Sequence, residues 1–143
     1  MRNPTESFKG KVALFSGRFD FIHLFHWITV LRLLKEYGFD KVVIVVLDYP
    51  ERKFAVGVVM QLWKELIRNS GLDDTVGVMT NTTHFREVTD RELQKIMGDD
   101  FARMVYISGN WETYRHLYNL GIECLFVEAS YGIHASDYEL KVE

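Results

Sequence analysis

Apolar runs rich in β-branched residues alternate along this chain with segments of helical period, and no other feature restricts the fold more strongly. The alternation is typical of a parallel sheet built from βαβ units. Right-handed crossovers then favour an α/β fold, a Rossmann-like three-layer sandwich with a five-stranded parallel sheet ordered 3-2-1-4-5. The predicted strands are Val12–Ser16, Lys41–Leu47, Asp74–Met79, Arg103–Ser108 and Glu123–Glu128; the predicted helices are His23–Tyr37, Val56–Asn69, one beginning near Thr89, and one from Gly109 to Leu120.

Length and composition agree with a single domain covering residues 1–143, because 48% of the residues are hydrophobic and half the chain would be short of core. No stretch approaches the roughly 20 apolar residues of a membrane span. The N-terminal residues, 1–11, are polar and lack the apolar core of a signal peptide. We therefore expect a cytoplasmic protein that does not associate with membranes.

Charge and cysteine content bear on three possibilities: a nucleic-acid partner, an internal disulfide and a cysteine-built metal site. The formal net charge is −3 and there is no dense Lys/Arg block, which disfavours a nucleic-acid partner. Cys124 is the only cysteine, so an internal disulfide and a cysteine-built metal site are both excluded. Because Cys124 lies in an apolar run, we expect an inert buried thiol.

The predicted strand order locates a ligand site. The chain reverses direction between strands 1 and 4, and ligands of such sheets bind where the carboxyl ends of those two strands part. The loops predicted there are Gly17–His26 and Gly109–Glu112.

The first of these loops carries two histidines, His23 and His26, at the start of a predicted helix. Residues three apart share a helix face, and a helix N-terminus attracts anions. Imidazoles placed there can donate to phosphate oxygens and stabilise developing charge. The alternative is a pair of capping or half-buried histidines without a ligand, which is the commoner outcome for an isolated pair.

The stretch as a whole resembles the signature of the nucleotidyltransferase superfamily, Gly-x-Phe-Asp/Pro-x-x-His-x-Gly-His. Gly17, Phe19, Asp20, His23 and His26 fall on it with the family's spacing. Phe25 departs from it, because the family has glycine at that position. The resemblance implies catalytic roles for both histidines and nucleotide binding by Gly17, Arg18, Phe19 and Asp20.

A second block follows the last predicted strand. The segment Tyr131–Asp137 is similar to the Gly-Ile-Ser-Thr-Ser/Thr-Asp segment of cytidylyltransferases, with His134 and Ala135 replacing small hydroxyl residues. In the family this segment opens a helix that holds the triphosphate. The alternative is an ordinary helix cap. By resemblance the nucleotide-binding residues here are Gly132, Ile133, His134 and Ser136.

Two weaker matches lie between these blocks. The family has a lysine after strand 2 that neutralises the triphosphate, and Lys53 is its candidate, whereas Arg52 matches no family position and is expected to matter less. A solvated loop is the alternative for Lys53. Gly109, Asn110 and Trp111 resemble the family's base- or ribose-holding loop; alternatively Asn110 caps the next helix and Trp111 belongs to the core.

By resemblance, the protein is an enzyme that moves a nucleoside monophosphate onto a phosphorylated small molecule and releases pyrophosphate. CTP is the expected donor, because of the 132–137 segment, and ATP is the alternative. Mg²⁺ is expected to arrive with the triphosphate, and no protein metal ligands are expected. Many relatives dimerise, so a homodimer is possible. His84 is expected to be a solvated loop residue or to reach the acceptor, and His116 to be a surface residue.

A rival interpretation of another class is a non-catalytic nucleotide-binding regulatory protein on the same fold, favoured by Phe25 and Ala135. An NAD-binding or flavodoxin-like domain lacks support, because Gly17-x-Phe19 does not continue into Gly-x-Gly-x-x-Gly. The acceptor cannot be deduced from the residues: glycerol phosphate, a sugar phosphate, phosphoethanolamine and flavin or nicotinamide nucleotides all remain open.

Overall fold

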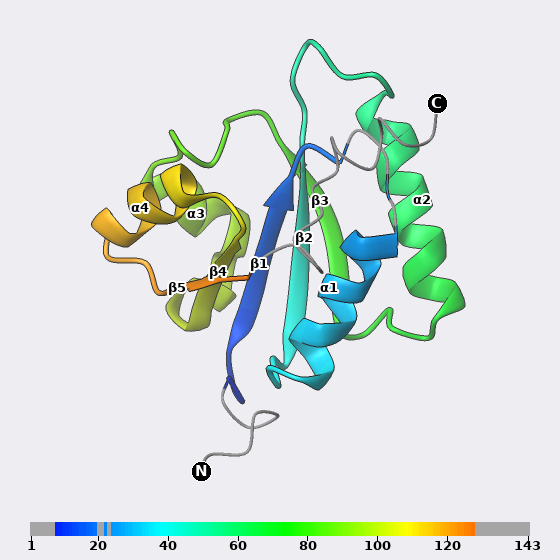
Figure 1. Ribbon diagram of the computed structural model, residues 1–143, viewed down its shortest axis with the longest axis horizontal. Coiled ribbons are helices and arrows are strands. Elements are labelled where there is room, and N and C mark those ends of the chain that lie inside the picture. Colours follow the sequence, from blue (N-terminus) through cyan, green and yellow to red (C-terminus); the bar gives the residue numbers. More distant parts are fainter. Residues whose placement is uncertain (1–7, 20–21, 23, 128–143) are drawn as a thin grey trace.

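Five parallel strands form one sheet in the order β3-β2-β1-β4-β5, as the sequence predicts (Figure 1). The computed structural model describes residues 8–19, 22 and 24–127. The strands are β1 (Val12–Gly17), β2 (Lys41–Leu47), β3 (Val76–Asn81), β4 (Met104–Ser108) and β5 (Cys124–Phe126). The connecting helices are α1 (Leu24–Lys35), α2 (Val56–Asn69), α3 (Asp90–Met97), a 3-10 turn η2 (Gly98–Arg103) and α4 (Trp111–Asn119).

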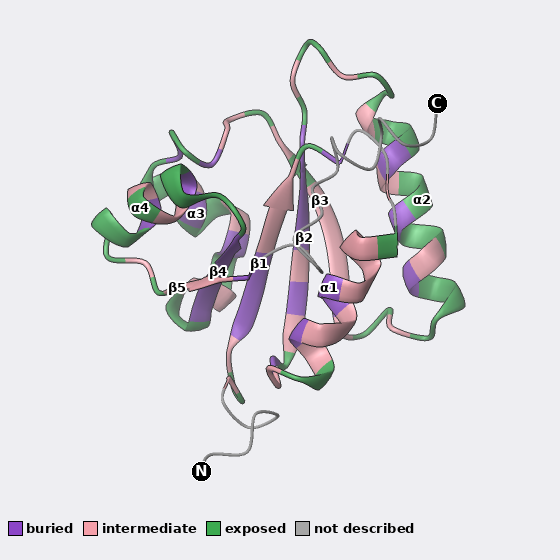
Figure 2. Ribbon diagram, in the orientation of Figure 1, coloured by how far each residue is buried: buried purple, intermediate pink, exposed green. Residues whose placement is uncertain are grey.

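The helices cover both faces of the sheet, which makes three layers. Helices α1 and α2 lie on one side, and α3 and α4 lie on the other (Figure 1). Because successive side chains of a strand point to opposite faces, Ala13 packs in the cluster under α1 and α2, whereas Val12 and Leu14 pack in the cluster against α3 and α4. Burial is greatest in β2 and β4, whereas the outer faces of the helices are exposed (Figure 2).

Local chemistry favours the start of α3 and the end of α4. Helix α3 starts at a capping box, near the predicted Thr89, in which the Thr89 Oγ1 accepts a hydrogen bond from the Glu92 N–H at 3.1 Å. Gly121 follows α4 with φ of +82°, a conformation that glycine adopts without steric cost. None of the helices that the structure describes is long and apolar enough to cross a membrane.

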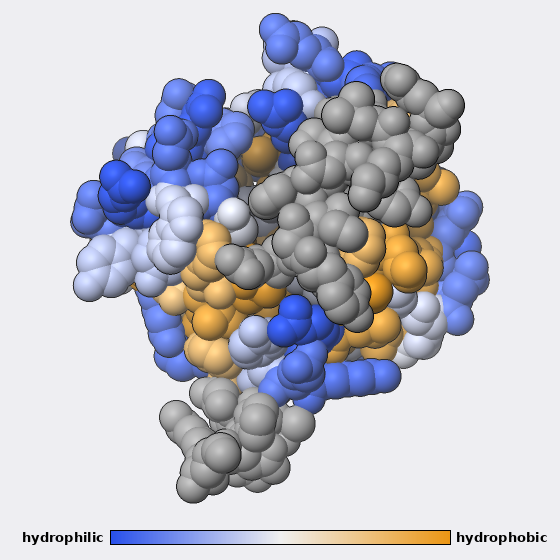
Figure 3. Space-filling view, viewed as in Figure 1, coloured by the Kyte–Doolittle hydropathy of each residue, from blue (hydrophilic) through white to orange (hydrophobic). Residues whose placement is uncertain are grey.

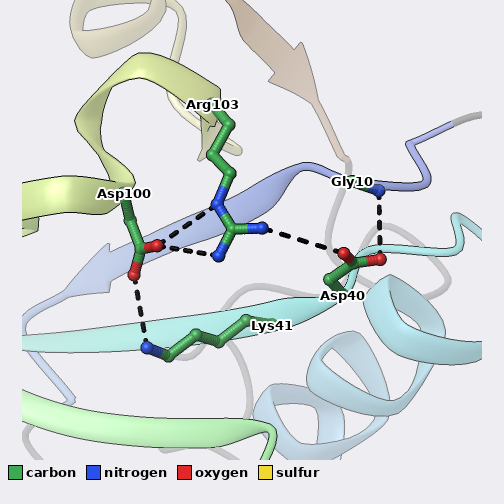
Figure 4. A network of polar contacts seen from close by, with 5 residues as sticks. All are labelled: Gly10, Asp40, Lys41, Asp100 and Arg103. Atoms are coloured by element: carbon green, nitrogen blue, oxygen red, sulfur yellow. Dashed lines mark hydrogen bonds and ion pairs between the residues drawn. The ribbon is translucent and has the colours of Figure 1, made fainter.

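A charged network joins the amino ends of three strands (Figure 4). Asp100, in η2, binds Arg103 at 2.9 Å and Lys41 at 3.2 Å. Asp40 accepts the Gly10 N–H at 3.0 Å and lies 3.8 Å from Arg103. The network therefore connects the segments that precede β1, β2 and β4.

Apolar side chains gather over α1 and the sheet beside it in the space-filling view, whereas hydrophilic residues cover the outer sides of α2, α3 and α4 (Figure 3). A cavity of about 300 Å³ lies at the amino edge of the sheet. Lys11 and Glu123, which line the cavity, form an ion pair at 3.3 Å. None of the predicted site residues that the structure describes lines this cavity.

Candidate functional site

The predicted site loops do meet at the carboxyl edge of the sheet. Strand β1 pairs with β2 on one side and with β4 on the other, so the loops that follow these three strands start from adjacent positions. The Ser16 and Tyr106 hydroxyls, 2.5 Å apart, bridge β1 and β4 close to the point where the chain reverses. Burial raises the pKa of the Tyr106 hydroxyl, so it stays protonated and serves this bridge.

Phe19 anchors the loop after β1 in the core. Its side chain is 5% exposed, and its ring packs edge-on against Phe15 and Trp63, with centroids 5.4 Å away in each case. The backbone φ of Phe19 is +45°, in the left-handed region that non-glycine residues seldom adopt. The loop therefore doubles back so that the Phe19 ring returns to the protein interior.

Gly17 makes room for that ring. A Cβ atom at Gly17 would lie 3.1 Å from the Phe19 ring, closer than ordinary van der Waals contact. The family resemblance implies that this glycine binds the nucleotide. The structure adds a packing reason: the signature residues Gly17 and Phe19 are interdependent.

His26 lies in the first turn of α1 and reaches the same ring. The His26 and Phe19 rings are perpendicular, with centroids 4.9 Å apart. Signature residues seven positions apart are thus in direct contact at the end of β1. Phe25, which replaces the family's glycine, is half-buried, and its carbonyl accepts a hydrogen bond from the Thr29 hydroxyl at 2.9 Å.

Arg52 joins the loops after β1 and β2. Its guanidinium donates to the carbonyl oxygens of Leu47 at 2.7 Å, Phe19 at 2.9 Å and Phe54 at 2.9 Å, and also to that of Arg18. Sequence reasoning missed this role, because main-chain acceptors leave no side-chain motif.

Cationic and aromatic groups surround this junction. The guanidinium carbons of Arg18 and Arg52 lie 5.3 Å and 5.5 Å from the centroid of the Tyr49 ring. Lys53, the predicted triphosphate lysine, is exposed on the same loop. The carboxyl edge of the sheet therefore presents arginine and lysine side chains, a suitable setting for a polyanion.

His84 belongs to the same edge, since it follows β3. Its Nδ1 accepts the Arg86 N–H at 3.1 Å. Partial burial, together with the positive charges of Arg86 and Arg18, lowers the pKa of His84, although Glu87 opposes the shift. The neutral imidazole is therefore favoured.

The loop after β4 is occupied by helix capping. The Asn110 Oδ1 accepts the N–H groups of Glu112 at 2.8 Å and Thr113 at 3.3 Å, which confirms the capping alternative for this residue. A Cβ at Gly109 would lie 3.2 Å from the carbonyl oxygen of Val127, so the backbones approach closely there.

Trp111 begins α4 and is not a core residue. It is 58% exposed and stacks on Phe126 of β5, with ring centroids 3.9 Å apart and planes 10° from parallel. The ring is held at the edge of the predicted site, and a large part of its surface faces solvent.

Several predicted site residues lie outside the described residues, and the structure places none of them. They are Asp20 and His23 of the first block and Gly132, Ile133, His134 and Ser136 of the last. Of the residues described, no group of three or more His, Cys, Asp and Glu is arranged to hold a metal ion.

Two further residues, His116 and Cys124, lie outside the motifs. His116 is half-buried, and its Nε2 lies 2.8 Å from the Val88 carbonyl oxygen, so it connects α4 to the segment before α3. The Cys124 thiol donates to the Ile122 carbonyl oxygen at 3.3 Å. Partial burial and the nearby Glu123 raise its pKa to about 11, as fits an unreactive thiol.

Comparison with known proteins identifies a similar fold. No family model and no curated protein sequence matches the chain. Among solved structures, the chain is similar to a bifunctional NMN adenylyltransferase/ADP ribose pyrophosphatase from Francisella tularensis, complexed with AMP and a manganese ion. The TM-score is 0.65 and the sequence identity 15%, over 92% of this chain and 41% of that one. The chain thus spans less than half the length of the solved protein, and the likeness establishes the Rossmann-like fold.

Proposed function

We propose that this protein is a nucleotidyltransferase that moves a nucleoside monophosphate from a nucleoside triphosphate onto a phosphorylated small molecule. The observation that carries the proposal is the position of the signature residues. Phe19 packs against both Gly17 and His26 at the carboxyl end of β1, where the strand order reverses. Ligands of open α/β sheets bind at this point. The fold shared with an adenylyltransferase supports the same function.

The proposed reaction is an in-line displacement. An oxygen of the acceptor phosphate attacks the α-phosphorus of the triphosphate, and the bond from that phosphorus to the α,β-bridging oxygen breaks. The bond electrons leave with pyrophosphate. No protein nucleophile is required, so catalysis consists of positioning and charge neutralisation.

The protein groups have distinct proposed roles. His23 and His26 donate hydrogen bonds to phosphate oxygens as charge develops, and Lys53 neutralises the departing pyrophosphate. Arg18, Asp20 and Trp111 belong to the nucleotide pocket, together with residues 132–136. Mg²⁺ enters as part of the triphosphate substrate, since the family resemblance does not call for a carboxylate cage on the protein.

The choice of nucleotide has support on both sides. The resemblance of residues 132–137 to the cytidylyltransferase segment favours CTP, whereas the similar solved structure is an adenylyltransferase with AMP bound, which favours ATP. Phe25→Gly restores the family residue and removes a half-buried ring from the first turn of α1. We expect this variant to change the relative affinity for CTP and ATP, measured by calorimetry.

A pyrophosphate-release screen tests the activity directly. Each of CTP and ATP is paired with glycerol phosphate, sugar phosphates, phosphoethanolamine and flavin and nicotinamide mononucleotides. We expect release with one triphosphate and one acceptor class, and its loss in His26→Ala. Binding of a triphosphate without release in any pairing supports the rival function, a regulatory nucleotide-binding protein.

A further inference from the structure

Arg52 donates four hydrogen bonds to main-chain carbonyl oxygens at the carboxyl edge of the sheet. Its Nη1 donates to the carbonyl oxygens of Leu47 and Arg18, its Nη2 to that of Phe19, and its Nε to that of Phe54. The acceptors come from the end of β2, from the loop after it and from the loop after β1. The guanidinium therefore crosslinks two loops that are 33 residues apart in sequence.

These contacts engage most of the hydrogen-bonding capacity of the side chain. An arginine has five N–H donors in a rigid planar fork, and four hydrogen bonds to carbonyl oxygens are formed here. A guanidinium with its donors directed at main-chain oxygens is poorly available to a phosphate. Its influence on a bound triphosphate must therefore act through the loop that it holds.

The held segment has an unfavourable conformation. Phe19 has a φ of +45°, which is costly for a residue with a side chain. Two contributions stabilise this conformation. The Phe19 ring is buried, and Arg52 donates hydrogen bonds to the Arg18 and Phe19 carbonyls.

The direction of the Arg18 and Phe19 carbonyls determines which polar groups of the loop are available to a bound anion. Because a trans peptide is planar with C=O and N–H antiparallel, a carbonyl turned toward Arg52 turns the N–H of the same peptide away from it. The Arg18 carbonyl is held this way, and the Phe19 N–H points to the opposite side. The Arg18 and Phe19 carbonyl oxygens, which would repel a phosphate, are hydrogen-bonded to Arg52. The Phe19 N–H, which can donate to an anion, points away from Arg52.

From this geometry we propose that Arg52 is a positioning residue that fixes the loop after β1 in the form that receives the triphosphate. The inference rests on the proposed nucleotidyl transfer for its catalytic consequence, but its structural part does not. It reverses the ranking based on motifs, in which Arg52 matters less than Lys53.

Limited trypsin digestion of the ligand-free protein tests the structural part. Trypsin cleaves after Arg18, and the carbonyl of that scissile bond is one of the Arg52 acceptors. Arg18 is exposed, yet we expect the Arg18–Phe19 bond of the wild type to be cut more slowly than peptide bonds after exposed arginines in helices that fray. We expect Arg52→Lys to accelerate cleavage after Arg18 selectively. Arg91→Lys, at an exposed position of α3, should not.

Kinetics test the catalytic part. Lysine keeps the charge but cannot reproduce four bonds of a planar fork, so Arg52→Lys should lose about 10²-fold in kcat/KM, nearly as much as Arg52→Gln. If Arg52 instead contacted phosphate as a point charge, the lysine variant would keep most of the activity and the glutamine variant would lose it. That outcome overturns the inference.

The digestion and the kinetic experiments together distinguish the loop-holding role of Arg52 from the proposed nucleotidyl transfer. A wild type that releases no pyrophosphate, with accelerated cleavage after Arg18 in Arg52→Lys, refutes the proposed function and leaves the loop-holding role intact. Normal cleavage after Arg18 and normal turnover in a folded Arg52→Lys refute the inference alone. If both variants unfold, the wild-type digestion decides, because rapid cleavage after Arg18 contradicts a held loop.

Discussion

The imidazole of His26 stands perpendicular to the ring of Phe19, with centroids 4.9 Å apart, and Phe19 in turn lies over Gly17. The signature residues on either side of the turn are therefore packed on one another. A change at one of them is transmitted to the others through ring contacts.

Replacing His26 with alanine should affect both catalysis and stability. We expect a loss of at least about 10²-fold in turnover, because a donor to the developing charge is removed. We also expect a loss of about 1 kcal/mol in the free energy of unfolding, because the contact with the Phe19 ring is lost. Steady-state kinetics and urea denaturation measure the two effects.

His116→Ala is the matched control for that variant. It removes the contact with the Val88 carbonyl oxygen, far along the chain from the signature, and should lower stability with little change in turnover. Full activity in a folded His26→Ala protein would eliminate the proposed catalytic role.

Gly17→Ala should destabilise the protein, because the added methyl would lie 3.1 Å from the Phe19 ring. Displacing a buried ring typically costs about 1–3 kcal/mol. Gly57→Ala is the comparison: a Cβ there meets nothing within 4 Å, and alanine favours the helix, so stability should rise by up to about 1 kcal/mol. Equal thermal midpoints for the two variants would contradict the packing argument.

Lys53→Ala should reduce turnover more than it reduces triphosphate affinity. A cation that neutralises the leaving pyrophosphate interacts more strongly in the transition state than in the ground state, and such interactions appear in kcat. Nucleotide binding is measured by calorimetry and turnover by pyrophosphate release. Lys64→Ala, at an exposed position of α2, is the control. A variant that loses affinity alone would assign Lys53 to ground-state binding.

His84 should make stability depend on pH just below neutrality. Because its pKa in the folded protein is below 6.5, the unfolded chain binds the proton more readily than the folded one. The protein should therefore lose stability as pH falls from about 6.5 toward the lowered pKa of His84, whereas this group should not affect stability at pH values above about 6.5. Urea denaturation across pH 7.5–5 should show a smaller decrease in His84→Gln than in the wild type. Identical pH profiles would show that His84 does not contribute.

Strand order and most element positions follow from the sequence, because buried parallel strands carry uninterrupted β-branched runs. Strand β2 and helix α2 begin and end where the pattern predicts. Strand β3 was predicted to start at Asp74 but starts at Val76, because the Thr75 and Val76 N–H groups both bond to the Leu72 carbonyl in the turn that closes α2. The η2 turn has no periodicity long enough to be recognised.

The candidate site could likewise be predicted only in part from the sequence. The loops after β1 and β4 lie where the sequence predicts, because glycines and a helix cap mark their positions. Side-chain motifs did not reveal Arg52, whose partners are carbonyl oxygens that every residue possesses. They also did not reveal His116, whose acceptor is a carbonyl 28 residues away.

The ion network of Asp40, Lys41, Asp100 and Arg103 has a consequence for how such a protein diversifies. It joins strand beginnings at the edge of the sheet opposite the loops after β1, β2 and β4, so it fastens neighbouring strands to one another without involving those loops. Substitutions at exposed positions of the loops after β1, β2 and β4, such as Arg18, Lys53 and Trp111, can therefore accumulate without disturbing the register. The exposed side chains of those loops can vary while Gly17, Phe19 and Arg52 keep the main chain of the loops in place.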